Sequence, residues 1–264
     1  MTGLHVRRDG RSRPGARPLV LLHGWSCHGG FFAPQMTAFA SRTLVLAPDL
    51  PGHGESAAFP APTIEAAADA LADLLDREDL SDVVLSGWSM GALVAWSLIA
   101  RHGTARIARL VVEDMSPKVI NTPDWPHGSL NGLDAARNLV FLRAIGSQWP
   151  RLAPATARRC FAADADPALV AWTEAEIRKA DPLRLAAMWH SLTAQDFRPL
   201  MPRLDIPVTL AHGARSQLYS AETALWQAGQ LPEARVLSFA ASGHAPHLEE
   251  SLAFNEMLGE QVFQ

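Results

Sequence analysis

Apolar residues are concentrated in six short runs that are separated by longer, more polar stretches. The runs cover residues 18–22, 43–47, 82–86, 107–113, 207–211 and 235–239. Unbroken apolar runs of this length are typical of strands that are covered on both faces of a parallel sheet. We therefore predict that these six segments form a mostly parallel sheet.

Several of the intervening stretches have apolar residues at helical spacing. Residues 63–79 follow this spacing, with Thr63 as a suitable N-cap and acidic residues in the first turns. Residues 94–101 and 221–231 are further helix candidates. Strands that alternate with helices in this way predict a doubly wound α/β fold.

The alternation stops between residues 116 and 204. This stretch is helix-rich and carries four of the chain's eight tryptophans, namely Trp125, Trp149, Trp172 and Trp189. We predict a helical lid at residues 116–204, inserted into a core of residues 1–115 and 205–264. Packing between lid helices would explain any one of these tryptophans, but together they favour an apolar substrate pocket. The candidate pocket residues are Trp25, Trp88, Trp125, Trp149 and Trp189.

Composition argues against a nucleic-acid-binding, membrane-spanning, secreted or disulfide-rich protein. The net charge of −4 gives no electrostatic support for nucleic-acid binding. No apolar run approaches the ~20 residues that span a bilayer, and the amino-terminal residues lack a secretory signal core. Cys27 and Cys160 are too few for a disulfide framework, so we expect buried, reduced cysteines and a cytoplasmic protein.

Residues 87–91 read Gly-Trp-Ser-Met-Gly and lie between an apolar run and a helical pattern. This is the context in which G-x-S-x-G forms a nucleophile elbow. Glycine is needed on both sides because the turn is too tight for side chains. We therefore predict that Ser89 is a nucleophile, exposed at the carboxyl end of a strand.

A serine nucleophile needs a general base, and two histidines follow the last predicted strand. His244 lies nearer the strand end and is the favoured base, because a neutral imidazole can accept the serine proton and later return it. His247 is interpreted as a helix-terminus or lid-facing residue.

The negative charge on the reacting carbonyl oxygen needs two backbone N–H groups. The candidates are the amide of Met90, which follows the nucleophile, and that of Trp25, in the loop after the first predicted strand. His23 in the same loop is expected to brace it rather than to act as a base. This chemistry requires no metal ion or organic cofactor.

Four segments together resemble the α/β-hydrolase superfamily: residues 23–25, 49–56, 87–91 and 243–244. The resemblance covers nearly the whole chain apart from the lid. It implies the α/β-hydrolase fold with a helical lid and a Ser-His-acid triad. The 49–56 loop is structural in that superfamily, so the resemblance assigns no catalytic role to Asp49 or His53.

The acid of the triad is missing from its usual place. The resemblance puts it after the next-to-last strand, where this chain has Ser216. A subgroup of small bacterial esterases has an Asp-x-Ser-Pro segment after the strand that follows the nucleophile strand, and residues 114–117 match it. That resemblance makes Asp114 the acid, with Glu113 as the alternative. Since adjacent strand residues point to opposite faces, only one of the two should reach His244. Capping of the lid's first helix is the structural alternative for Asp114.

These residues predict a serine esterase that cleaves carboxylic esters through an acyl-enzyme. Thioesterases and lactonases share the same triad, and a small-molecule binding protein on this fold is disfavoured because nucleophile, base and acid are all present. The 23–25 and 87–91 segments also resemble pimeloyl-carrier methyl ester esterases, in which basic lid residues meet an acidic carrier. The substrate is then a small ester or an acyl-carrier-bound one. The basic lid residues here, which solvation alone would also explain, are Arg137, Arg143, Arg151, Arg158 and Arg159.

Overall fold

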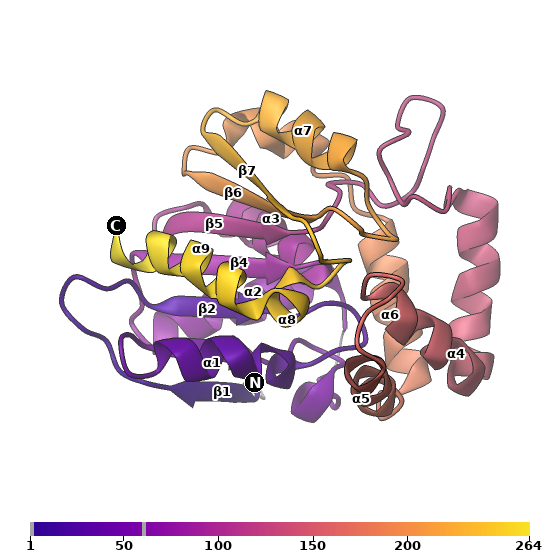
Figure 1. Cartoon of the computed structure of the whole chain (residues 1–264), viewed down its shortest axis with the longest axis horizontal. Helices are drawn as coiled ribbons and strands as arrows, with labels where there is room; N and C mark the ends of the chain where they lie inside the picture. Colours follow the sequence, from indigo (N-terminus) through magenta and orange to yellow (C-terminus); the bar gives the residue numbers. More distant parts are fainter. Residues whose placement is uncertain (1–2, 60–61) are drawn as a thin grey trace.

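A computed structural model describes residues 3–59 and 62–264 and contains a seven-stranded sheet in the order β1-β3-β2-β4-β5-β6-β7 (Figure 1). β1 pairs antiparallel with β3, and the other neighbouring strands pair in parallel. The strands are β1 (Val6–Asp9), β2 (Leu19–Leu22), β3 (Val45–Pro48), β4 (Val83–Trp88), β5 (Ile107–Glu113), β6 (Val208–Gly213) and β7 (Ala234–Phe239). The predicted mostly parallel α/β sheet is confirmed.

The six predicted strands correspond to β2 to β7, with small shifts at their ends. β1 is an additional strand that the apolar pattern does not predict. Its sequence, Val-Arg-Arg-Asp, is polar, and its residues are half-buried or exposed at the sheet edge. An edge strand needs no continuous apolar run because only part of its surface is covered.

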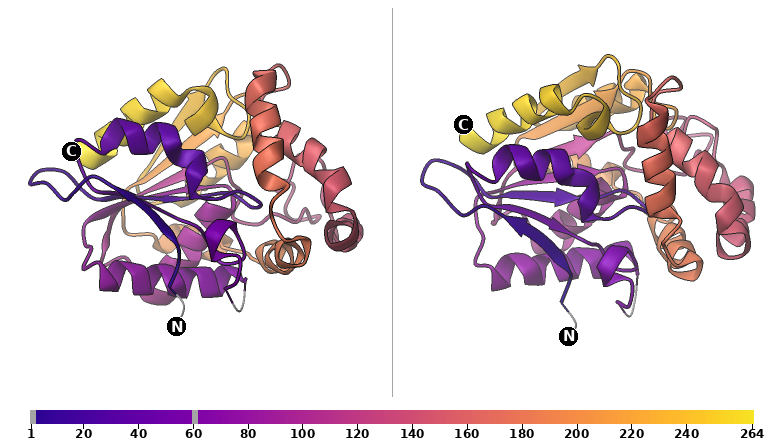
Figure 2. Two further views of the ribbon diagram at one scale, coloured as in Figure 1. Left: turned by 90° about the horizontal axis from the view of Figure 1, so that it is seen from below. Right: turned by 60° about the horizontal axis from the view of Figure 1, so that its bottom comes forward.

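Helices cover both faces of the sheet (Figure 2). α1 (Ala33–Phe39) and α9 (Ser251–Phe263) pack side by side on one face, and α2 (Ile64–Arg77) and α3 (Met90–His102) on the other. α7 (Ala221–Gln230) packs on β6 and β7, and the short α8 (Pro246–Glu249) precedes α9. As predicted, Thr63 caps α2, accepting a hydrogen bond from the amide of Ala66. Three 3-10 segments lie at Gly29–Phe32, Gly54–Ser56 and Arg198–Arg203.

Successive strand residues serve different cores. In β2, Val20 and Leu22 belong to the cluster under α2 and α3, whereas Leu19 and Leu21 belong to the cluster under α1 and α9. This follows from the strand's period of two, and burial on both faces explains why these runs are continuously apolar.

Three helices between β5 and β6 stand at one end of the sheet (Figure 1). They are α4 (Ala135–Arg159), α5 (Pro167–Ile177) and α6 (Pro182–Thr193), and we call residues 135–193 the helical insertion. α4 is kinked at Gln148, whose φ of −131° is not helical, just before Pro150. Among the described residues, no helix is long and apolar enough to cross a membrane.

The turn from β4 into α3 brings backbones unusually close together. A Cβ on Gly91 would lie 2.1 Å from the carbonyl oxygen of Leu22, and one on Gly87 would lie 2.5 Å from the amide nitrogen of Ala92. Ser89 between them has φ 53° and ψ −119°, a conformation that costs energy for a residue other than glycine. The elbow therefore depends on both glycines and on the packing of α3 against β2.

Replacing Gly91 by alanine should lower the free energy of unfolding by about 2 kcal/mol or more, because the new methyl group overlaps the Leu22 carbonyl. Gly146→Ala in α4 is the matched control. Its added methyl meets only Leu183 Cδ2, at 3.6 Å, and alanine is favoured in a helix by about 0.5–1 kcal/mol. Urea denaturation of the two variants and the parent checks this; equal stability of Gly91→Ala and the parent would contradict the close approach.

Candidate active site

Asp114, directly after β5, is a buried carboxylate with three hydrogen-bond donors. Its Oδ2 accepts from Nδ1–H of His244 at 2.6 Å and from the hydroxyl of Ser216 at 2.6 Å. Its Oδ1 accepts from Nδ1–H of His212 at 2.9 Å. Burial by itself would raise the pKa of Asp114, but the hydrogen bonds from His212 and His244 outweigh it, and that pKa lies below its ordinary value. Asp114 is therefore held as a carboxylate against His244.

Glu113, one residue earlier, faces a different histidine. Its Oε1 accepts from the backbone amide of His247 at 2.9 Å and from Nδ1–H of the same residue at 2.8 Å. Both side chains are fully buried. As expected, only one of the two carboxylates reaches His244, and it is that of Asp114. Strand alternation is not the reason, because β5 ends at Glu113 and Asp114 has a left-handed φ of 44° that turns the chain away from the strand. The N-cap of α4 is Asp134 rather than Asp114.

His247 lies in the first turn of α8, in agreement with the interpretation that it is a helix-terminus residue. It does not face the insertion. Its ring packs instead against Phe32 and Trp88, with ring centroids 4.8 and 4.7 Å apart.

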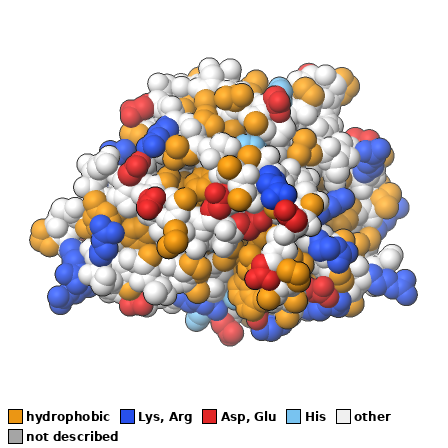
Figure 3. Space-filling view, in the orientation of Figure 1, with side chains coloured by type: hydrophobic (Ala, Val, Ile, Leu, Met, Phe, Trp, Pro, Cys, Tyr) orange, Lys and Arg blue, Asp and Glu red, His pale blue; other side chains and the backbone are white. Residues whose placement is uncertain are grey.

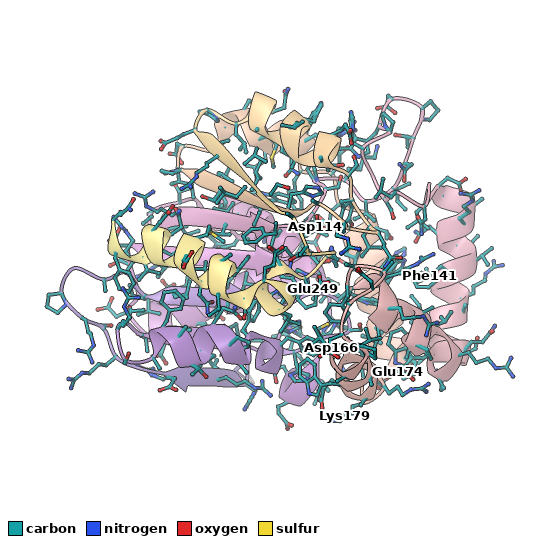
Figure 4. All side chains as sticks on the ribbon, in the orientation of Figure 1. Asp114, Phe141, Asp166, Glu174, Lys179 and Glu249 are labelled. Carbon is teal, nitrogen blue, oxygen red and sulfur yellow. The ribbon has the colours of Figure 1, made fainter. Side chains whose placement is uncertain are left out.

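A cavity of about 310 Å³ lies between the carboxyl edge of the sheet and the helical insertion. Ser89, Met90, Trp25 and His244 all line it, so the predicted nucleophile, base and oxyanion donors open onto one space. Figure 4 shows Asp114 at this boundary and Phe141 on the insertion side. The rest of the lining is mostly apolar and includes Met115, Val119, Leu133, Phe141, Leu192 and Leu218, with polar groups from Ser129, Asn131, Arg137, Thr156 and Arg159.

Three of the five candidate pocket tryptophans line this cavity: Trp25, Trp88 and Trp189. Trp149 is buried behind Trp25, with ring centroids 5.3 Å apart, and is not part of the lining. Trp125 packs against Trp226 at 4.6 Å and also lies outside it. Apolar character alone does not reveal which way a tryptophan faces after folding, whether in a helix, as for Trp149, or in a loop, as for Trp125.

The loop that carries Trp25 is braced from both sides. Nδ1–H of His23 donates to the carbonyl of Gly24 at 2.8 Å, and Nε2 accepts from the amide of Leu50 at 2.8 Å. Burial, followed by repulsion from His53, lowers the pKa of His23 to about 3, so its ring stays neutral. The indole N–H of Trp25 donates to the carbonyl of Leu185 in α6 at 3.0 Å.

The amide of Met90 is available because Met90 is the first residue of α3. The first four N–H groups of a helix have no partner within it and carry the positive end of its dipole. Such a group beside Ser89 suits a developing oxyanion.

The sequence pattern does not predict His212 and Ser216 as hydrogen-bond partners of Asp114. In the sequence, Ser216 stands out only because it occupies the position where an aspartate is expected. His212 is a polar residue near the end of an otherwise apolar strand. A polar side chain at the carboxyl end of a buried strand is the sequence signal that would identify His212.

Within residues 3–59 and 62–264, no group of three or more His, Cys, Asp or Glu side chains is arranged to hold a metal ion. Both cysteines are buried and unpaired. Cys160 lines the cavity, but burial raises the pKa of its thiol to about 12, so it is not a thiolate nucleophile at neutral pH.

Asp114→Asn should lower kcat in p-nitrophenyl ester assays by roughly three to four orders of magnitude, because an amide cannot stabilise the imidazolium. Glu113→Gln should have a mild effect, because Gln keeps an oxygen for the two donors on His247. A larger loss in Glu113→Gln than in Asp114→Asn would assign the acid to Glu113.

Trp189→Ala should shift the preferred acyl length, because Trp189 lines the cavity. Trp125→Ala, an equal loss of volume outside the cavity, is the control. Rates on p-nitrophenyl esters of increasing chain length measure both. A preference that is identical in the parent and Trp189→Ala would show that this side chain does not set specificity.

Known proteins resemble the chain in sequence and in fold. The model of the alpha/beta hydrolase family matches residues 19–257. The chain is 31% identical over 252 residues to a pimeloyl-[acyl-carrier protein] methyl ester esterase of Chromobacterium violaceum, covering 92% of this chain and 93% of the relative. It is 34% identical to the Aromatoleum aromaticum esterase of the same description, covering 87% and 92%.

Solved structures agree on the fold. An esterase from Exiguobacterium antarcticum superposes with a TM-score of 0.90 at 21% identity, covering 99% of this chain and 96% of the other. An enol-lactonase from Burkholderia xenovorans superposes with a TM-score of 0.84 at 25% identity, covering 98% and 95%. The chain therefore belongs to the alpha/beta hydrolase family and is a carboxylic ester hydrolase.

Proposed function

We propose that Ser89, His244 and Asp114 are the triad of this hydrolase. The hydrogen bond from His244 Nδ1 to Asp114 carries the proposal, because it leaves Nε2 free to accept a proton, and His244 lines the same cavity as Ser89. Ser89 Oγ attacks the ester carbonyl while His244 takes its proton. The oxyanion is stabilised by the amides of Trp25 and Met90.

Collapse of the tetrahedral intermediate breaks the bond to the alcohol, which leaves with the proton from His244. A water molecule then attacks the acyl-enzyme and gives its proton to His244. The carboxylic acid departs as this proton returns to Ser89. Asp114 remains ionised throughout and orients the ring.

We also propose that the helical insertion is a lid and that the substrate ester is carried by an acidic acyl carrier. Two relatives are described as pimeloyl-[acyl-carrier protein] methyl ester esterases. α4 has no acidic residue and carries five arginines, which are Arg137, Arg143, Arg151, Arg158 and Arg159. Basic side chains are visible on the side of the molecule where the insertion lies (Figure 3).

The arginines of α4 are not neutralised by neighbours. None of the five forms an ion pair within the described part of the chain. Arg137 and Arg159 also line the cavity, so positive charge lies beside the entrance to the proposed triad. An acidic partner docked there would place its acyl chain close to Ser89. A reducing compartment such as the cytoplasm suits the two unpaired cysteines.

Arg159→Glu should raise KM for a carrier-bound methyl ester by about tenfold, with a steeper loss at low ionic strength, because charge reversal weakens docking. KM for p-nitrophenyl butyrate should change much less than KM for the carrier-bound ester, because this small ester meets Arg159 only as part of the cavity lining and makes no docking contact. Arg11→Glu, an exposed arginine of the amino-terminal segment, is the control. Equal KM values for Arg159→Glu and the parent would contradict carrier docking on α4.

The substrate class needs a direct comparison, since an enol-lactonase is among the structural neighbours. The purified enzyme would be assayed on a carrier-bound methyl ester, the free methyl ester, a lactone and a thioester. We expect the highest kcat/KM on the carrier-bound methyl ester. A preference for the lactone would replace this proposal with lactone hydrolysis by the same residues.

A further inference from the structure

The loop that carries His244 is held by two consecutive carboxylates. It connects β7 to α8 and has no regular secondary structure. Glu250 Oε2 accepts from the amide of Ala241 at 3.0 Å and from the hydroxyl of Ser242 at 2.6 Å. Glu249 Oε2 accepts from the amide of Gly243 at 2.7 Å. The position of His244 therefore depends on these side chains from the start of the carboxyl-terminal helices.

Glu249 also binds the helical insertion. Its second oxygen, Oε1, accepts from the amide of Ala162 at 2.8 Å. Ala162 lies between α4 and α5, 87 residues from Glu249 in the sequence. One carboxylate thus bridges the insertion and the residue next to His244. Figure 4 shows Glu249 near Asp114, where the sheet meets the insertion.

The bridge joins two backbones that are already in contact. A Cβ on Gly243 would lie 2.2 Å from the carbonyl carbon of Phe161 and 2.3 Å from the amide nitrogen of Ala162. No side chain separates the two segments there. A displacement of residues 161–162 therefore moves Gly243, and with it His244.

We infer that Glu249 is a positioning residue that couples the helical insertion to the catalytic loop. The inference rests on the proposed triad. With both bonds made, the loop directs His244 toward Asp114 and the cavity. When the insertion moves, as a lid does to admit substrate, Oε1 loses Ala162, and the loop is left with its other contacts alone. The enzyme is then most active with the insertion seated.

Chemistry explains why a carboxylate is needed at this position. The two amides donate to different oxygens of Glu249, so both oxygens must be acceptors. A glutamine has one acceptor and one donor group, and its NH2 would oppose one of the two amides. At Glu250 both donors use the same oxygen, so glutamine keeps both bonds. Glu250→Gln is therefore a control of matched chemistry in the same loop.

Glu249→Gln should lower kcat on p-nitrophenyl butyrate between about tenfold and a hundredfold with KM unchanged, because small misplacements of a catalytic group have effects of this size. Glu250→Gln should stay within about twofold of the parent. Melting temperatures are measured in parallel. If Glu249→Gln does not fold, Glu249→Asp replaces it, because the shorter side chain keeps the charge but cannot span both amides.

Amide hydrogen exchange tests the coupling itself. Glu249→Gln should accelerate exchange at both Ala162 and Gly243, whereas Glu250→Gln should leave Ala162 unchanged. Three results would overturn the inference. They are an unchanged kcat in Glu249→Gln, an equal loss of kcat in Glu250→Gln, and faster exchange at only one of Ala162 and Gly243 in Glu249→Gln. Fluorophosphonate labelling of the parent enzyme distinguishes an error in the coupling inference from an error in the assignment of the triad. If the parent is not labelled at Ser89, the triad is wrong; if the parent and Glu249→Gln are labelled at equal rates, the coupling is wrong.

Discussion

Asp114 is a carboxylate removed from water, and such a group costs several kcal/mol unless donors surround it. Its three donors come from separate parts of the chain, namely the end of β6, the turn after it and the loop after β7. The carboxyl edge of the sheet is stable only when these segments meet. The contacts that keep Asp114 ionised in its buried position are thus the same contacts that hold His244 in the proposed triad.

The helical insertion both lines the cavity and forms hydrogen bonds with two loops of the site. It receives the hydrogen bond from the Trp25 indole and gives one to Glu249. The two loops that carry the proposed oxyanion donor and the proposed base are thus both held from the same side. A substrate that repositions the insertion would act on both loops at once, so specificity and catalysis share one set of contacts.

Ser216 shows how sequence and structure complement each other. In the sequence, Ser216 occupies the position where an acid is expected, so the acid is predicted at Asp114 instead. In the structure, the Ser216 hydroxyl donates to Asp114 Oδ2 at 2.6 Å. The position at which the resemblance expects the acid thus donates a hydrogen bond to the proposed acid. That relation could not be predicted, because residues 114 and 216 are joined only when β5 and β6 pair.

The sequence by itself determined the six apolar strands and the elbow around Ser89, because strand period and turn geometry are local properties. That Asp114 and Glu113 face different histidines was expected from strand alternation, but in the structure it comes from the left-handed backbone of Asp114 just past β5. The apolar pattern does not predict the edge strand β1, because most of its residues are polar. Only the tertiary structure decided that Trp189 lines the cavity while Trp125 does not, and that Glu249 bridges two segments. Those features depend on contacts between residues far apart in the chain, which no local pattern records.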